Sequence, residues 1–218
     1  VIRDPLGMNG IRLEVDTLIL EANIHSLKTL YKCIETAGFR REGTVFSAIS
    51  AGSAVLPKKQ KELGVILVDM GGGTADFVIY EEGRLIHAGF LPIGGNHITN
   101  DIAIGFQTTI DIAEKIKLHH GVALTDLVPK KEIIRLAEFV VDDSSSFPRK
   151  DLAEIIEARL KDVFELLHRE LKKINRSQLL PAGVVLVGGG ARIPGIVEVA
   201  KREMRLPVTI GVPHSFSN

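Results

Sequence analysis

The pattern of apolar and polar positions predicts two strands that are buried on both faces, each followed by three glycines. Residues 65–68 and 184–187 are uninterrupted apolar runs without the alternation of a half-exposed strand. The first run continues through Asp69 and Met70 into a Gly-Gly-Gly-Thr sequence, and the second enters its glycine triplet directly. Both triplets therefore interrupt the chain at the carboxyl end of a predicted strand.

The rest of the pattern predicts an α/β domain. Strands are expected over 75–80 and 84–91, separated by the turn Glu82-Gly83, which makes an antiparallel meander with the first buried strand. Further strands are predicted over 11–20, 45–49 and 208–211. Helices are predicted over 26–37, 96–104, 109–119, 151–175 and 194–205. Residues 124–147 show a weak, polar pattern, and 142–146 are expected to form a loop.

Composition places the chain among globular proteins. Its 218 residues are 45% apolar and 25% charged, enough for one large or two small domains. The 27 basic and 27 acidic side chains balance, which argues against a nucleic-acid partner. A single cysteine excludes an internal disulfide framework and a multi-cysteine zinc site. No apolar run is long enough to span a membrane or to form a signal peptide, so a cytoplasmic location is expected.

The two glycine triplets point to phosphate binding. Glycines after buried strands let a ligand approach the backbone, whose N–H groups can donate to phosphate oxygens. Ligands of open sheets bind beyond the carboxyl ends of strands, where both triplets are expected. The carboxylate of Asp69 suits a hydrated Mg²⁺, which takes few protein ligands. A single glycine triplet most often forms only a turn, so the prediction of phosphate binding depends on the presence of both triplets.

Several familiar sites are excluded. Neither triplet is followed by G-K-[ST], and G-x-G-x-x-G is not matched, so the sequence has no Walker A loop or dinucleotide fingerprint. No H-x-x-x-H spacing and no nucleophile–base constellation is present. Glu114 and Lys117 lie three residues apart on one helix face, either as a surface ion pair or, near a nucleotide, as groups that contact ribose or base.

Longer stretches resemble a known superfamily. Residues 64–80, G-V-I-L-V-D-M-G-G-G-T-A-D-F-V-I-Y, resemble the second phosphate motif of the actin, DnaK-chaperone and sugar-kinase superfamily. Residues 184–196, V-V-L-V-G-G-G-A-R-I-P-G-I, are similar to its adenosine motif. Within the superfamily the chain resembles the FtsA family of bacterial cell-division proteins, in the stretches 4–16, 94–103, 113–124 and 151–159.

The resemblance implies an actin-like ATPase fold, a ribonuclease H-like mixed sheet flanked by helices. It implies the second lobe plus part of an inserted subdomain, with the first phosphate loop expected before Val1 and a membrane-binding amphipathic helix after Asn218. The expected divisions are 1–40 for the end of the inserted subdomain, 41–62 for the tail of the first lobe, and 63–218 for the second lobe, with 97–175 as its outer subdomain and 63–96 and 176–218 as its inner one.

The resemblance also implies ATP and Mg²⁺ as ligands. Asp69 would hold the metal, and Gly71, Gly72, Gly73 and Thr74 would contact phosphates. Glu114 and Lys117 would border the ribose and base, and Gly188, Gly189 and Gly190 would lie against the nucleoside. No catalytic residue is implied, and at most a weak ATPase activity.

The function implied by the resemblance is that of a filament-forming adaptor. It would polymerise and link the tubulin-like division ring to the cytoplasmic membrane, with further division proteins as partners and no nucleic acid. It would lie on the inner face of the membrane at the division site. Two alternatives from the same superfamily stay open: a PilM-type pilus-assembly scaffold, and a small-molecule kinase whose catalytic carboxylate would lie in the first lobe.

Overall fold

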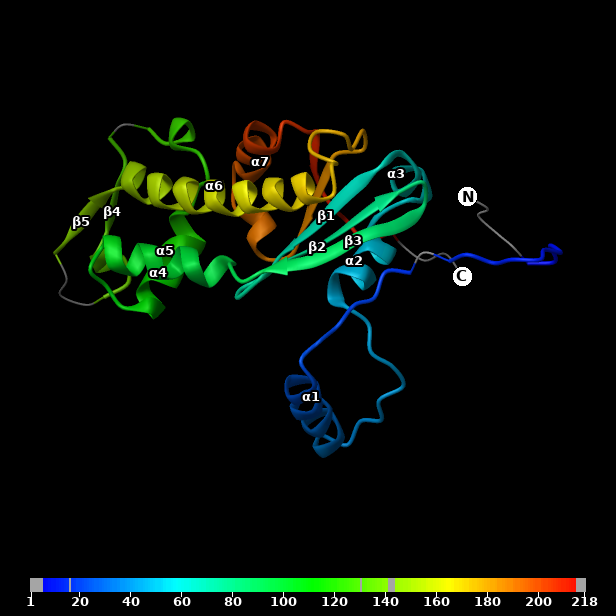
Figure 1. Ribbon diagram of the computed structural model, residues 1–218. Coiled ribbons are helices and arrows are strands. Elements are labelled where there is room, and N and C mark those ends of the chain that lie inside the picture. The colour runs from blue at the N-terminus through cyan, green and yellow to red at the C-terminus, as the bar shows by residue number, and fades with distance from the viewer. Residues whose placement is uncertain (1–5, 16, 130, 141–143, 215–218) are drawn as a thin grey trace. The chain divides into compact units, whose positions relative to one another are not determined.

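The computed structural model describes residues 6–15, 17–129, 131–140 and 144–214 (Figure 1). The chain divides into two compact units, residues 1–41 and residues 42–218. The helices are α1 Ile24–Thr36, α2 Ser47–Val55, α3 Lys58–Leu63, α4 Gly95–Gly105, α5 Ile110–His120, α6 Arg149–Lys173 and α7 Ile196–Met204, with short 3₁₀ turns η1 Thr125–Leu127, η2 Leu136–Glu138 and η3 Gly190–Arg192. The strands are β1 Val65–Met70, β2 Ala75–Glu81, β3 Arg84–Leu91, β4 Ile133–Arg135, β5 Ser146–Pro148, β6 Val184–Val187 and β7 Val208–Ile210.

Among its described residues, 6–15 and 17–41, the N-terminal unit has one helix, α1, which the sequence correctly predicts. Asn23 caps its start, because the side-chain oxygen accepts from the backbone N–H groups of His25 at 3.0 Å and Ser26 at 3.1 Å. Gly38, with φ of +84°, follows its end. None of the residues of α1 is buried within the described structure.

The strand expected over 11–20 is wrong. Its described residues, 11–15 and 17–20, form no strand, and side chains such as Ile11 are exposed. Apolar alternation alone does not make a strand, which needs a hydrogen-bonded neighbour, and no described segment pairs with this one. Residues 4, 5 and 16 of the resembling stretch 4–16, and residues 142 and 143 of the expected loop, lie outside the described residues.

The second unit is built on a five-stranded sheet with strand order β3-β2-β1-β6-β7. The antiparallel pairs β1–β2 and β2–β3 form the meander that the sequence predicts. On its other side β1 runs parallel to β6, and β6 runs parallel to β7. The mixed sheet therefore places the carboxyl ends of β1 and β6 side by side.

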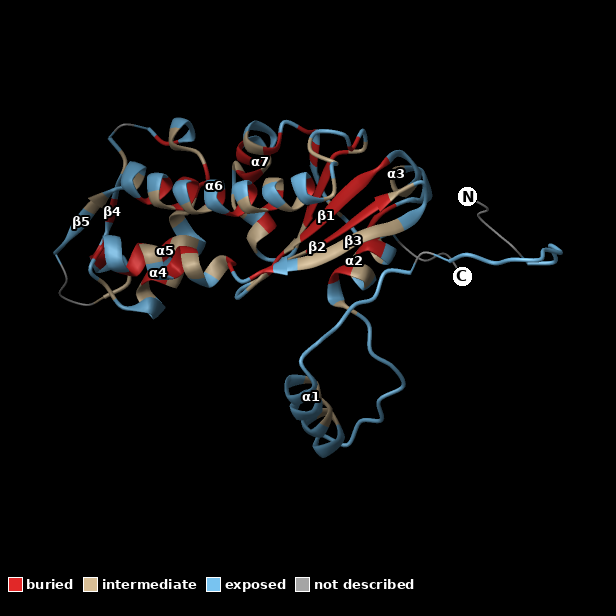
Figure 2. Cartoon of the chain, viewed as in Figure 1, coloured by how far each residue is buried: buried red, intermediate tan, exposed pale blue. Residues whose placement is uncertain are grey.

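Both faces of β1 are covered, as its apolar run predicts (Figure 2). Ile66 and Val68 belong to a large core formed with α4, α5, α6 and α7. Val65 and Leu67 point to the opposite face, where a smaller core packs them against α2. This alternation shows that the strand keeps its period of two although every position is apolar.

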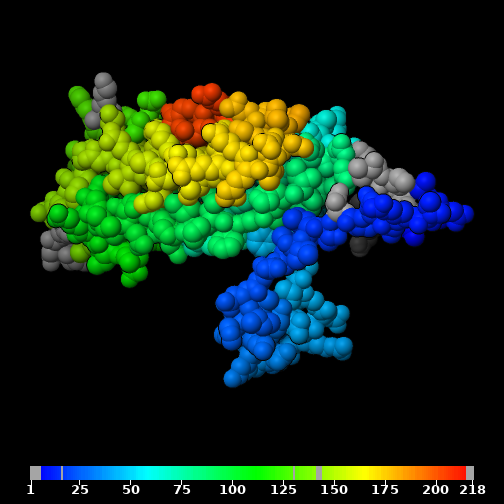
Figure 3. Space-filling model, in the orientation of Figure 1, coloured from blue at the N-terminus to red at the C-terminus, as the bar shows by residue number. Residues whose placement is uncertain are grey.

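Helix α6 joins two parts of this unit. It extends from the small β4–β5 sheet, beside α4 and α5, to the large sheet and α7 (Figure 1). Its apolar stripe, including Leu160, Phe164 and Leu167, is fully buried, and its other side is exposed along the face shown in Figure 3. The three-residue strands β4 and β5 lie within the weakly patterned region, because segments so short carry little periodicity.

Two local expectations are wrong. Residues 45–49 are not a strand: Phe46 is the N-cap of α2, whose small residues let the helix lie close to the sheet. A Cβ at Gly52 would lie only 3.2 Å from the Tyr80 ring. Helix α7 begins at Ile196 rather than Pro194, because Gly195 has φ of +85°, outside the helical region. Within the described ranges, no helix is both long and apolar enough to cross a membrane.

Candidate functional site

The parallel pairing of β1 with β6 brings the two glycine triplets together. Asp69 lies opposite Val187, the residue before the second triplet. A Cβ placed on Gly188 would overlap Oδ1 of Asp69, and one on Gly190 would lie 2.9 Å from Cβ of Met70. Residues about 120 positions apart in sequence thus form one end of the sheet, and the absence of side chains at the triplets permits their approach.

The first triplet forms a tight hairpin that the start of α4 holds in place. The Gly71 N–H donates to the Thr74 carbonyl at 2.9 Å. The carbonyls of Gly71 and Gly72 accept from the first N–H groups of α4, those of Gly95 at 2.9 Å and Asn96 at 2.8 Å. Two of the unpaired donors at this helix terminus are therefore satisfied by the hairpin.

A cavity of about 570 Å³ opens between these elements. Six glycines line it: Gly71, Gly72, Gly95, Gly121, Gly189 and Gly190. Charged side chains also line it, namely Glu114, Lys117, Arg149 and Arg192, together with the apolar Leu118, Ile193 and Pro194. The combination of exposed backbone, cations and an apolar end fits a ligand with an anionic part and a flat apolar part.

A second cavity, of about 500 Å³, lies beside the first. Asp69 and Gly188 line it, and Gly189 and Arg192 line both cavities. The loop after β6 therefore separates the predicted metal ligand from the larger cavity. Gly73 and Thr74 line neither of these two cavities.

Asp69 lies in an acidic environment at the end of β1. Burial raises the pKa of Asp69, and the negative charge of Asp76, directly opposite on β2, raises it further. Asp76 itself accepts a hydrogen bond from Ser47 Oγ at 2.9 Å. Among the described residues no group of three or more His, Cys, Asp and Glu side chains could hold a metal ion. Because Mg²⁺ takes few protein ligands, the Asp69 carboxylate could still serve it, with waters completing most of the octahedron.

Glu114 and Lys117 form an ion pair that lines the larger cavity and is partly buried. The Lys117 Nζ is 2.6 Å from Glu114 Oε2, and the Lys117 side chain is only 10% exposed. Both groups also bond the hydroxyl of Thr99 on α4. Burial alone would raise the pKa of Glu114, but hydrogen bonds from Lys117 and Thr99 outweigh it and lower that pKa.

Sequence reasoning misses several residues of this site. Arg192 carries the clearest signal, because it follows the second triplet by two positions. Asn96 follows Gly94-Gly95 at the start of a predicted helix. Arg149 has no local signal: it reaches the cavity from the first turn of α6, where Nε donates to the His120 carbonyl at 2.9 Å and Nη1 to Glu132 at 2.7 Å.

Comparison with known proteins identifies the family. The family model described as "Cell division protein FtsA" matches residues 66–218. The chain belongs to the FtsA family. It is 36% identical over 214 residues to the FtsA cell-division protein of Pseudomonas aeruginosa, covering 98% of this chain and 51% of that protein. The corresponding protein of Neisseria meningitidis is 37% identical over 216 residues, which cover 99% and 52%. The chain spans about half the length of these curated relatives.

Solved structures confirm the fold class expected for this FtsA-family chain. Spiroplasma citri MreB5 bound to ADP superposes with a TM-score of 0.71 at 18% identity, covering 88% of this chain and 61% of that one. The PilM–PilN type IV pilus biogenesis complex superposes with a TM-score of 0.64 at 16% identity, covering 84% and 46%. At these identities the likeness concerns the fold alone, which is actin-like: a mixed sheet flanked by helices.

Proposed function

We propose that this chain is the ATP-binding second lobe of an actin-like cell-division protein, with part of the inserted subdomain in residues 1–40. One observation carries the proposal: the β1–β6 pairing puts both glycine triplets at a single cavity with Glu114 and Lys117. Membership of the FtsA family and the actin-like fold support it. In this proposal the cavity binds the nucleotide on the side of this lobe.

The residues present fit an adenine nucleotide. The backbone at Gly71, Gly72 and Gly189 is open to the cavity, and a Cβ at Gly189 would meet no atom within 4 Å. N–H groups of the triplets would donate to phosphates, and the apolar end at Leu118 and Ile193 would receive the base. Asp69 would hold Mg²⁺ from the neighbouring cavity. Phosphate contacts by Gly73 and Thr74 stay predictions.

When bound, the nucleotide would supply a phosphate chain, which is longer in ATP than in ADP. The residues of this chain would bind and orient it, and none of them is assigned a catalytic role. At most a weak ATPase activity is expected from the complete protein.

A pair of glycine variants tests the nucleotide site. Gly189→Val would place a side chain in the cavity without touching protein atoms near its Cβ, whereas Gly43→Val, equally unobstructed, lies outside both cavities. In calorimetric titrations with Mg·ATP we expect saturable binding by the parent chain and by Gly43→Val, and a loss of about tenfold or more in Gly189→Val. Equal affinities in all three proteins would exclude this cavity as the site.

The cellular part of the proposal follows from the family. The complete protein would polymerise and link the tubulin-like division ring to the cytoplasmic membrane, through a segment outside these 218 residues. A fluorescent fusion of a complete protein carrying this chain should form a ring at mid-cell. It should co-purify with the tubulin-like protein and sediment as filaments with ATP.

The same fluorescent fusion and the same protein also test two alternative functions. The likeness to the PilM–PilN structure favours a pilus-assembly scaffold as the second candidate, and its fusion would gather where pili assemble instead of at mid-cell. A small-molecule kinase would transfer phosphate to a sugar or acetate. Turnover of about 1–100 s⁻¹ on such a substrate, as in typical kinases, would contradict the adaptor function.

A further inference from the structure

The start of α4 has no side chain at its N-cap. The N-cap residue is Gly94, which cannot accept from the first turn of the helix. A Cβ there would lie 2.6 Å from the carbonyl oxygens of Gly71 and Gly72, so a larger residue does not fit between the helix and the hairpin. The N–H groups at this helix start must therefore find acceptors other than the usual Ser, Thr, Asp or Asn at the N-cap.

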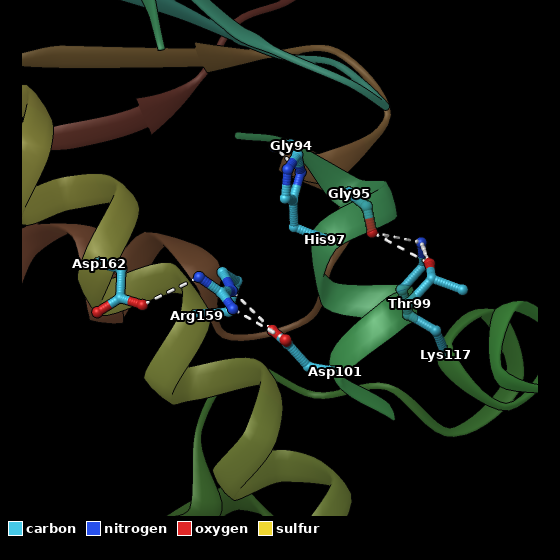
Figure 4. Close-up of polar contacts among 8 residues, drawn as sticks. All are labelled: Gly94, Gly95, His97, Thr99, Asp101, Lys117, Arg159 and Asp162. Carbon is cyan, nitrogen blue, oxygen red and sulfur yellow. Dashed lines mark hydrogen bonds and ion pairs between the residues drawn. The ribbon is translucent and has the colours of Figure 1, made fainter. Parts of the chain in front are cut away.

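The acceptors come from the hairpin and from His97, in the first turn of α4. The N–H groups of Gly95 and Asn96 donate to hairpin carbonyls at 2.9 and 2.8 Å. The N–H of Gly94 donates to Nδ1 of His97 at 3.1 Å, and the His97 N–H donates back to the Gly94 carbonyl at 3.0 Å. Figure 4 shows the imidazole next to Gly94, on the other side of α4 from Thr99. The imidazole thus fixes the glycine that lies against the hairpin.

The bond to Gly94 requires an imidazole without a proton on Nδ1. Neutral histidine can carry its proton on Nε2 and leave Nδ1 as an acceptor, whereas protonated histidine donates from both nitrogens. The helix dipole also disfavours a positive charge in the first turn of a helix. Protonation of His97 would therefore remove its bond to Gly94 and place a cation at the unfavourable end of α4.

The charged groups around α4 do not pair with His97. The charged side chains at its contacts with α5 and α6 pair with one another: Glu114 with Lys117, and Asp101 with Arg159 (Figure 4). The hairpin has no charged side chain between Asp69 and Asp76, the carboxylates at its two ends. Among the described residues His97 forms no ion pair of its own, so its response to pH depends on the hydrogen bond to Gly94.

We infer that His97 is a proton-sensitive positioning residue, whose neutral imidazole holds Gly94, and with it the hairpin, in the conformation that receives phosphate. The inference rests on the proposed function and adds regulation by pH to it. Protonation of His97 loosens the bonds from Gly95 and Asn96 to the hairpin, and the affinity of this lobe for nucleotide falls. The proton acts through the start of α4, because His97 does not line the larger cavity.

The first test needs no nucleotide. Protection factors from hydrogen exchange, which are corrected for the pH dependence of exchange itself, report how firmly the Gly95 and Asn96 N–H groups are held. Histidine changes its charge in the range of about pH 5 to 8, so the full chain is measured at about pH 7.5 and about pH 5.5. We expect both protection factors to fall about fivefold at the lower pH, the usual effect of losing one hydrogen bond.

Two variants separate the proton from the side chain. His97→Gln is the conservative replacement, because Gln at the third helical position accepts from the N-cap N–H and does not titrate. Its protection factors should be equal at the two pH values. His97→Leu has no acceptor and should show, at both pH values, the lower protection of the acidified parent. No fall in the parent, or an equal fall in His97→Gln, would overturn the inference. If His97→Gln does not fold, the comparison of His97→Leu with the parent decides in the same way.

The second test measures the affinity of the same proteins for Mg·ATP. Because ATP has its own protonation in this range, the quantity compared is the ratio of the parent affinity to the His97→Gln affinity, in which the contribution of the ligand cancels. We expect this ratio to fall about fivefold between about pH 7.5 and about pH 5.5. A constant ratio would overturn the positioning role while leaving the proposed function intact.

Asp101→Asn is the matched control on the same helix. It breaks the bonds of 2.6 and 2.8 Å to Arg159, which also anchor α4 but do not involve Gly94 (Figure 4). This variant should keep the parental dependence on pH. Loss of that dependence would mean that His97 acts only through the general stability of α4, and would overturn the inference. No saturable binding of Mg·ATP by any of these proteins would overturn the proposed function itself.

Discussion

Gly188 and Asp69 lie in direct contact at the carboxyl ends of two parallel strands. The register pairs Asp69 with Val187, so the next residue turns across the end of β1. Gly188 has φ of +86°, which residues with side chains rarely adopt, and a Cβ there would overlap the Asp69 carboxylate. The predicted metal ligand and the second triplet are thus parts of one structural unit.

Gly188→Ala is expected to destabilise the chain by about 2 kcal/mol, because it adds backbone strain to the overlap with Asp69. Urea unfolding followed by circular dichroism would measure this loss. Gly189→Ala is the control, since Gly189 has helical φ and ψ values of −63° and −40° and open space at its Cβ. Equal stability of the two variants would contradict the described contact.

Gly94→Ala should release the hairpin from α4. A Cβ at Gly94 would lie 2.6 Å from the carbonyl oxygens of both Gly71 and Gly72, so the helix start must move and lose its bonds to them. We expect a loss of about 2 kcal/mol in the free energy of unfolding, and weaker ATP binding. Gly95→Ala, whose Cβ would meet only ordinary contacts from 3.6 Å, should retain the stability of the parent chain.

Asp69→Asn tests metal binding separately from nucleotide binding. The variant removes a charge that burial and Asp76 disfavour, so the nucleotide-free chain should be at least as stable as the parent at neutral pH. Its affinity for ATP should no longer respond to Mg²⁺, while its affinity in EDTA should match that of the parent. Titrations with and without Mg²⁺ measure both values, and an unchanged Mg²⁺ response would exclude Asp69 as the ligand.

Glu157 makes stability depend on pH in the acid range. Burial alone would raise the pKa of Glu157, but hydrogen bonds from Arg202, Lys161 and the Thr125 N–H lower it to about 2. Glu157 therefore holds its proton less tightly in the folded state than in the unfolded state, and its ionised carboxylate stabilises the fold. This stabilisation is complete above the ordinary pKa of 4.5 and is lost as pH falls toward 2.

Glu157→Gln should therefore cost about 2 kcal/mol at neutral pH and less at low pH. Unfolding free energies measured from pH 7 to pH 2 would show the two proteins converging as the parent becomes protonated. A constant difference across this range would contradict the assignment of the acid-range dependence to Glu157.

The sequence predicts most of the second unit because its strands and helices are long and bounded by glycines. Residues 84–91 and 184–187 are strands with the predicted limits, since each lies between clear turn signals. Residues 45–49 are not a strand, because packing of small residues against the sheet outweighs their local preference. Residues 11–20 show that an alternating pattern predicts a strand only where a partner is available.

The site is predicted where motifs are local and missed where only the fold brings residues together. The triplets, Glu114 and Lys117 carry a signal in spacing, and the structure brings Gly71, Gly72, Glu114, Lys117, Gly189 and Gly190 to one cavity. The contacts that Thr99 and Arg149 make depend on how α4, α5 and α6 pack, which no local pattern encodes. Separation of Asp69 from the larger cavity by the loop after β6 is likewise a property of the tertiary structure.

Amide NMR of the ¹⁵N-labelled chain during titration with Mg·ATP would show whether the two glycine triplets form one nucleotide site. We expect saturable shifts at Gly72, Gly95, Gly189 and Gly190, with the N–H groups of both triplets changing at the same ATP concentrations. The cavity lined by Ile104, Gly105 and Ile155, which shares no residue with the larger cavity, serves as an internal control and should show weaker changes. Shifts confined to that control cavity, or none that saturate, would contradict a nucleotide site between the two triplets.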